Sequence, residues 1–199
     1  GSVRCVLETD IMQFLKRNSI VIVFIVGCVF YSLSLAATVK NIIVNDLSIA
    51  QDNKDIFVDF DQELYLTSKM IHGLKNGIIL VFDINFILTK DIPYWFDDII
   101  LVKKSQYKIK YRNLLEKFEV VDINGEKLFF KDLPAALKYL KIVKKWYVGT
   151  LNEKEKKLLA SLRIQLNKNH LPKPLQINIK DKIWDFQSEE ITKYIEVNN

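Results

Sequence analysis

The densest group of chemically capable side chains is the aromatic and acidic run Tyr94-Trp95-Phe96-Asp97-Asp98. Such a run could form a ligand platform in which two carboxylates bind a cation. Adjacent strand residues point to opposite faces, so Asp97 and Asp98 would not converge on one metal ion. We favour a tight turn whose tryptophan packs into the core, and we expect neither a metal nor a cofactor.

Other reactive residue types are sparse. His72 and His170 are far apart, and no acidic residue lies at a helical partner spacing from His72, whereas a histidine metal site needs three or four ligands. Both cysteines, Cys5 and Cys28, precede residue 30, which excludes a cysteine nucleophile or cysteine-bound zinc beyond that point. The sequence contains no glycine-rich phosphate loop and no nucleophile elbow. We therefore expect a protein that is not an enzyme.

Basic residues are the third candidate feature. Two groups could form a basic surface for an anionic headgroup or polymer: Lys103, Lys104, Lys108, Lys110 and Arg112, and Lys138, Lys141, Lys144 and Lys145. The chain has 29 Lys and Arg against 24 Asp and Glu, a net charge of +5. Because this excess is small, we favour a solvated face and expect no nucleic-acid partner.

Alternating apolar residues predict strands that would carry these side chains. Such runs contain Ile56, Val58 and Phe60, then Phe82, Ile84, Phe86 and Leu88, and then Tyr107, Ile109 and Tyr111. Residues 51–54 predict a turn between two strands, Asn124-Gly125 predicts a hairpin, and residues 144–151 predict a short strand.

Four helices are predicted from apolar spacing and capping residues. The first contains Leu66, Met70 and Leu74 and ends at Asn76-Gly77, and the second begins after Asp132. The third spans about 153–168, with Leu158, Leu159, Leu162 and Leu166 inward, and Ser188 could cap a short fourth helix. Pro172 and Pro174 would separate the third helix from a strand containing Leu175, Ile177 and Ile179. The predicted fold is α+β, a mostly antiparallel sheet of six to eight strands with two or three packed helices; a β-sandwich with helical insertions is the alternative.

The N-terminal region predicts export. Asn18 to Val39 contains no charged residue, follows Lys16 and Arg17, and includes the small residues Ser34-Leu35-Ala36. We interpret residues 1–37 as an extension plus a signal peptide or membrane anchor, and residues 38–199 as one exported domain. Because basic residues stay in the cytoplasm, the domain is expected in the periplasm, free or anchored to the inner membrane.

Five segments in order resemble the bacterial domain-of-unknown-function family 4390. They are "GLKNGIILVFDINFIL", "DIPYWFDD", "YKIKYRNLLEKFEVVDINGEKLFFKDLPAALKYL", "KKWYV" and "HLPKPLQINI", over about residues 40–195. The family's Leu-Pro-x-Pro-Leu-Gln motif matches in full at residues 171–176, whereas the proline of its first strand motif is missing at residues 77–80. The resemblance implies an exported or membrane-anchored protein without a known activity. It also implies genes that neighbour sensor kinases of the nitrogen-regulation type and a ribosomal RNA methyltransferase.

Two functional hypotheses follow. The first is a non-enzymatic accessory module that interacts with an envelope protein, with a membrane sensor kinase as the partner suggested by the resemblance. The second is a binder or carrier of a small apolar or anionic ligand. The candidate ligand or partner surface consists of Tyr94, Trp95, Asp97, Tyr107, Tyr111, Arg112 and Trp146.

Overall fold

The structure is a computed structural model that describes residues 41–90, 98–151, 157–177 and 184–196. The chain divides into two units, Gly1–Val39 and Lys40–Asn199, and all described residues belong to the second unit. The predicted signal peptide or anchor lies outside the described residues. Within them, no helix is both long and apolar enough to cross a membrane.

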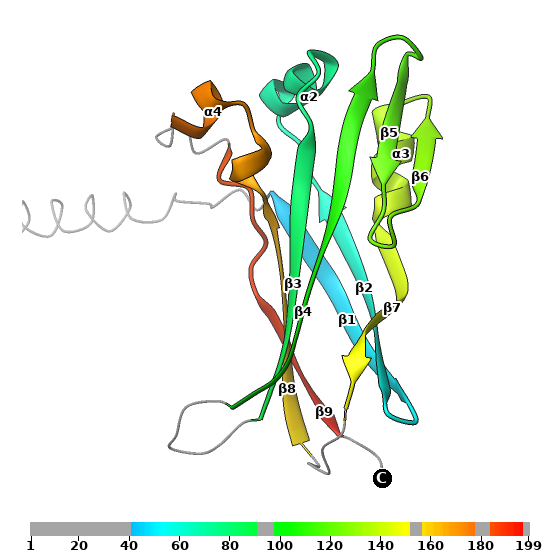
Figure 1. The fold of residues 1–199 in the computed structure, drawn as a ribbon, viewed down its shortest axis with the longest axis vertical. Helices are drawn as coiled ribbons and strands as arrows, with labels where there is room; N and C mark the ends of the chain where they lie inside the picture. The colour runs from blue at the N-terminus through cyan, green and yellow to red at the C-terminus, as the bar shows by residue number, and fades with distance from the viewer. Residues whose placement is uncertain (1–40, 91–97, 152–156, 178–183, 197–199) are drawn as a thin grey trace, which may run out of the picture. The chain divides into compact units, whose positions relative to one another are not determined.

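Alternating apolar residues form strands in two antiparallel sheets (Figure 1). The smaller sheet has the order β1-β2-β7 and consists of β1 (Ile42–Asp52), β2 (Asp55–Leu64) and β7 (Ile142–Thr150). The larger sheet has the order β6-β5-β4-β3-β8-β9. It consists of β3 (Leu80–Lys90), β4 (Asp98–Arg112), β5 (Lys117–Val121), β6 (Lys127–Phe130), β8 (Lys157–Leu166) and β9 (Ile191–Glu196).

Short helices lie at the ends of strands and are set by their capping residues. Helix α2 (Ser68–Lys75) begins at Thr67, whose side chain accepts a hydrogen bond from the Met70 backbone N–H. Helix α3 (Leu133–Leu140) begins at Asp132, which accepts from the Ala135 N–H at 2.8 Å. A 3₁₀ turn, η1 (Lys168–His170), precedes the five-residue helix α4 (Lys173–Ile177). The predicted stop at Asn76-Gly77 and the predicted cap at Asp132 are confirmed.

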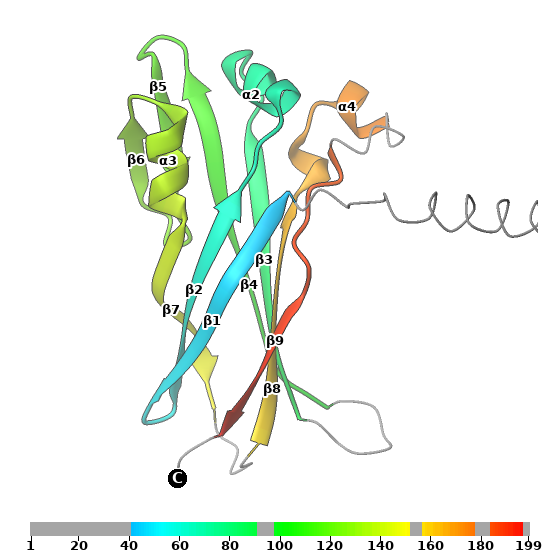
Figure 2. The same ribbon diagram turned by 180° about the vertical axis from the view of Figure 1, so that it is seen from behind.

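The core lies between the two sheets, which face each other in Figure 2. In β3, Phe82, Ile84, Phe86 and Leu88 are all fully buried, as their spacing predicts. Trp146 of β7 joins the sheets, because its ring meets Phe60 of β2 and Phe86 of β3 edge to face, each at 6.2 Å. Burial of these side chains holds the sheets together.

The two lateral sides of this sandwich differ. On one side β1 approaches β9, and the Lys193 ammonium donates to the Leu47 carbonyl at 2.8 Å. On the other side β7 approaches β4, where Gly149 lets Leu101 pack directly onto the β7 backbone. There α3 packs against β5 and β6 of the larger sheet and against β2 and β7 of the smaller one.

The predicted α+β class is wrong. The unit consists of two antiparallel sheets with short helices at strand ends, and no described helix covers a sheet face as a layer. The structure has nine strands among the described residues, in an arrangement closer to the alternative of a β-sandwich with helical insertions.

Three local predictions in the last third of the chain are also wrong. Residues 157–166 of the predicted third helix form β8, in which every second residue from Leu158 to Leu166 is buried. Residues 173–177 form α4 instead of a strand, because the fixed φ of Pro174 also suits a first helical turn. Ser188 caps no helix: it exchanges hydrogen bonds with the Ile164 backbone and precedes β9. Ile179 lies outside the described residues.

Candidate functional site

A pocket opens on the lateral side of the sandwich that contains α3 and β7. Its volume is about 160 Å³. Residues from β4, the β5–β6 turn, α3 and β7 line it: Tyr107, Asp122, Ile123, Asn124, Tyr139, Leu140, Ile142, Val143 and Lys144. It is therefore built from segments that the fold, not the sequence, brings together.

Asp122 forms one wall and also shapes the hairpin. One carboxylate oxygen accepts from the backbone N–H groups of Asn124 at 2.9 Å and Glu126 at 2.8 Å. Gly125 continues this turn at φ +85°, a conformation that suits glycine, so the predicted Asn124-Gly125 hairpin is confirmed. The other oxygen accepts from the Tyr139 hydroxyl at 3.0 Å, which ties the hairpin to α3.

Tyr139 is the titratable group at the mouth. Burial, followed by the hydrogen bond and negative charge of Asp122, raises the pKa of the Tyr139 phenol to about 12. The phenol is therefore protonated at physiological pH and donates a hydrogen bond to Asp122. A group with so high a pKa is a poor general base. The Tyr139–Asp122 hydrogen bond instead stabilises the packing of α3 on the hairpin.

The inner end of the pocket is a buried polar link between the sheets. Gln62 of β2 accepts from the Tyr107 hydroxyl at 3.1 Å, and its amide donates to the Leu140 carbonyl at 2.8 Å. Gln62 and Tyr107 are each only 1% exposed, and burial raises the pKa of Tyr107 well above its usual value. The link fixes the positions of β2, β4 and the end of α3 around the pocket.

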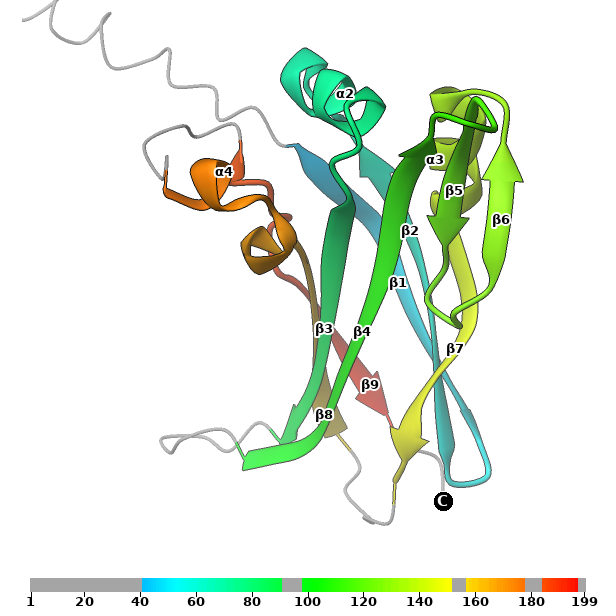
Figure 3. The same cartoon turned by 45° about the horizontal axis from the view of Figure 1, so that its top comes forward.

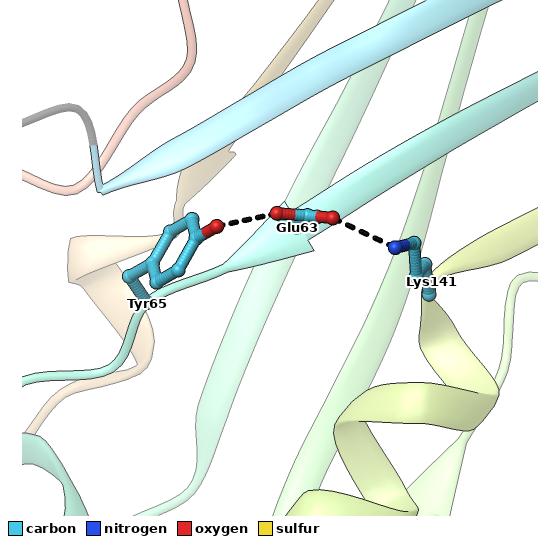
Figure 4. A network of polar contacts seen from close by, with 3 residues as sticks. All are labelled: Glu63, Tyr65 and Lys141. Carbon is cyan, nitrogen blue, oxygen red and sulfur yellow. Dashed lines mark hydrogen bonds and ion pairs between the residues drawn. The ribbon is translucent and has the colours of Figure 1, made fainter.

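A second polar network lies just outside, where α3 meets β2 (Figure 4). The Lys141 ammonium donates to Glu63 at 2.7 Å, and Tyr65 donates to the other oxygen of the same carboxylate. Lys141 and then Tyr65 lower the pKa of Glu63, and Glu63 in turn raises the pKa values of Lys141 and Tyr65. The network keeps the glutamate charged and holds the end of α3 on the smaller sheet.

The dimensions and the rim of the pocket indicate what could enter it. Sites for drug-sized ligands occupy roughly 300–1,000 Å³, whereas this pocket is nearer the size of one side chain. Two large side chains that line it remain exposed, Ile142 at 50% and Tyr139 at 37%. The recess is lined by both apolar and polar side chains and has exposed aromatic and aliphatic neighbours. Such a recess is suited to an anchoring side chain of another protein.

A larger hollow of about 300 Å³ lies near the end of β8, between Asp83, Asn167 and Asp185. Its polar groups bind one another: the Asn167 amide donates to Asp83, and Lys168 pairs with Asp185 at 2.9 Å. We therefore consider the pocket beside α3 the better candidate.

Of the sequence-predicted surface residues that the structure describes, it brings only Tyr107 to this pocket. Tyr107 lines it, whereas Trp146 is buried in the core. Tyr111 is half-buried, with its ring 4.9 Å from that of Phe118, and Arg112 points to the outer face, where it pairs with Glu119. Tyr94, Trp95 and Asp97 lie outside the described residues.

The two predicted lysine groups do not form one surface. Lys104, Lys108 and Lys110 alternate along the outer face of β4, whereas Lys103 lies 6.0 Å from the Tyr147 ring of the smaller sheet. Lys138 and Lys141 belong to α3 and its end. Among the described residues, no group of three or more His, Cys, Asp or Glu could hold a metal ion.

Sequence reasoning missed Asp122, Tyr139 and Ile142. An aspartate two residues before Asn-Gly does predict a side-chain-capped turn, and this signal could have singled out Asp122. Nothing in the sequence predicts that Tyr139 of a later helix reaches this turn, because that contact depends on how α3 packs.

Comparison with protein-family models finds a match. The model of a domain of unknown function, DUF4390, matches residues 39–193, which is most of the chain. No curated protein and no solved structure is similar enough to the chain to count as a match.

Proposed function

The chain belongs to the domain-of-unknown-function family DUF4390, and from this premise we propose that it is a non-enzymatic, protein-binding module of the bacterial envelope. The pocket beside α3 would receive one anchoring side chain of the partner. The exposed residues around the pocket would form the surrounding contact.

The observation that carries the proposal is the combination of pocket size and exposed rim. A recess of about 160 Å³ next to exposed Ile142 and Tyr139 matches the way in which interfaces seat a buried anchor inside a ring of weaker contacts. The same volume is small for a carried ligand, so we do not propose a carrier. Within the pocket, Asp122 and Tyr139 are hydrogen-bonded to each other, so neither is placed as a free general acid or base.

The strand edges on this side favour side-chain docking over the addition of a partner strand. In β7, Lys144 and Lys145 form a bulge opposite β2, with Lys145 at φ +52° and its N–H bound to Asp59 at 2.6 Å. The neighbouring edge strand β6 is only four residues long. Bulges, lysines and short edge strands all hinder edge-to-edge pairing.

The proposed partner is an integral protein of the envelope. Support for this location comes from the uncharged run between Asn18 and Val39, which we interpret as an export or anchor segment. Among envelope proteins, a membrane sensor kinase is the candidate suggested by the family resemblance.

Site-specific photocrosslinking in host membranes tests the proposal. Benzoylphenylalanine placed at Ile142 should give a crosslinked adduct with a discrete envelope protein, identified by mass spectrometry. The matched control is the same group at Thr192, an exposed position on β9. If Ile142 yields no adduct beyond that of Thr192, the proposed binding function is wrong.

A further inference from the structure

The turn between β4 and β5 exposes two leucines at its tip. Leu114 is fully exposed, at 101%, and its neighbour Leu115 is 56% exposed. Single exposed apolar residues are common, but two consecutive leucines at a protruding tip are not explained by the packing of this unit. They have no part in the pocket beside α3.

The turn itself does not require leucine. Its backbone closes through hydrogen bonds from Leu115 N to Arg112 O at 3.0 Å and from Glu116 N to Asn113 O at 3.3 Å, and Glu116 has φ +49°. Such turns favour Asn, Asp, Ser or Gly, which tolerate these angles or bond to the local backbone. The leucines are therefore better explained by a surface that they contact.

Basic side chains surround this tip. Lys110, Arg112 and Lys117 lie on the two strands that lead to it, and Arg112 is opposite Lys117 in the register. Of the nearby acids, Glu119 is only 5% exposed and is paired with Arg112, so Glu116 is the exposed negative charge of this hairpin tip. Exposed leucines flanked by Lys110 and Lys117 match the apolar and cationic contacts that proteins make with the interface of an anionic bilayer.

The same end of the unit carries two more basic segments (Figure 3). Helix α2 contains Lys69 and Lys75 and no acidic residue, and α4 begins at Lys173 and also contains none. The chain enters the unit here as well, because the Tyr65 N–H at the end of β2 donates to the Asn41 carbonyl at 2.9 Å. Glu63, Glu189 and Glu190 also lie at this end, beside the start of β1, so its positive charge is confined to the hairpin tip and these two helices.

We propose that Leu114 and Leu115 insert into the interfacial region of an anionic phospholipid bilayer, with Lys110 and Lys117 beside them contacting lipid phosphates. This surface is separate from the pocket. It would orient the unit on the membrane, whether or not the pocket binds a protein.

Nitroxide labelling of the full chain in vesicles tests this proposal. The label is placed at Leu115→Cys in a Cys5→Ser and Cys28→Ser background, and the chain is reconstituted into vesicles of phosphatidylcholine and phosphatidylglycerol. The matched control is Ala50→Cys, an exposed position near the opposite end of β1. Power saturation with oxygen and with a water-soluble nickel complex reports the immersion of each label.

The label at position 115 should lose access to the nickel complex and gain access to oxygen, relative to the label at position 50. Adding Leu114→Asp should restore aqueous access, and vesicles of phosphatidylcholine alone should give shallower immersion. Equal aqueous access at both positions would overturn the proposal, and equal immersion without the anionic lipid would overturn the role of the basic residues. Shielding in host membranes but not in vesicles would assign the tip to a protein and would also overturn it.

Discussion

Gln62 links the two sheets at the inner end of the pocket, and its replacement tests whether this link stabilises the unit. In Gln62→Leu the side chain keeps a similar volume but loses both hydrogen bonds. The Tyr107 hydroxyl and the Leu140 carbonyl then remain buried without these partners. Leaving one buried polar group unpaired costs about 1–3 kcal/mol, so with two such groups we expect a loss of about 2–6 kcal/mol in the free energy of unfolding.

Tyr107→Phe separates the contributions of the two Gln62 hydrogen bonds, because it removes only the bond from the Tyr107 hydroxyl. The phenylalanine can keep the stacking on Phe82, whose ring lies 5.0 Å away, so the main loss is the bond to the Gln62 oxygen. We expect a cost of about 1–2 kcal/mol. In the double variant only the Leu140 carbonyl is left unpaired, so its cost should be about 1 kcal/mol or more below the sum of the single costs.

Urea denaturation of the purified chain, followed by tryptophan fluorescence, measures these differences. Gln51→Leu is the matched control, because Gln51 is exposed and its loss should change stability by no more than about 0.5 kcal/mol. If Gln62→Leu destabilises the chain no more than Gln51→Leu does, the buried link is not a stabilising feature. Strict additivity in the double variant would show that Gln62 and Tyr107 do not act as a pair.

Three further predictions concern titration and location. Asp122→Asn should lower the pKa of Tyr139 from about 12 towards its ordinary value, because the raising charge is removed; ¹³C-labelled tyrosine NMR measures this, and an unchanged pKa would contradict the contact. Arg112 lowers the pKa of Glu119 in the folded chain. The pair therefore stabilises the fold fully above the ordinary glutamate pKa of about 4.3, and this stabilisation is lost as the pH falls through the lowered pKa of Glu119. The stability difference between the chain and Glu119→Gln should therefore be largest at neutral pH and shrink below about pH 4 in urea titrations; a constant difference would refute the charge effect. A phosphatase fused after Asn199 should be active in a bacterial host if residues 1–37 direct export, whereas an inactive, stable fusion would contradict the periplasmic location.

The strands with one buried face could be predicted from sequence, because burial of every second side chain requires an apolar residue at every second position. Phe82, Ile84, Phe86 and Leu88 alternate with half-buried residues, and β3 follows. Helices α2 and α3 could also be predicted from sequence, because the Asn76-Gly77 stop of the first and the Asp132 cap of the second depend on local chemistry.

Strand β8 shows why other elements could not be predicted. Leu158, Leu162 and Leu166 fit both a helical period and a strand period, and leucine-rich sequence favours helix. Pairing with β3 on one side and β9 on the other decides for the strand, and this information is not local. A helix in place of β8 adds a helix and removes a strand from the larger sheet, which explains why the sequence predicts an α+β fold.

Most of the candidate site could not be predicted from sequence either, because its contacts are also not local. Tyr107 was identified from its strand face, but the pocket also needs the contact between Asp122 and Tyr139, two residues whose elements meet only after α3 packs.

Blocking the pocket is the most direct test of the central claim that this recess binds an envelope protein. Asn124→Trp would place a large side chain at the mouth from an exposed turn position that lines the pocket. Lys127→Trp, on the outer face of the same hairpin, is the control. We predict that crosslinking from Ile142 disappears in Asn124→Trp and persists in Lys127→Trp, with both variants folded by circular dichroism. Undiminished crosslinking in Asn124→Trp would contradict the claim.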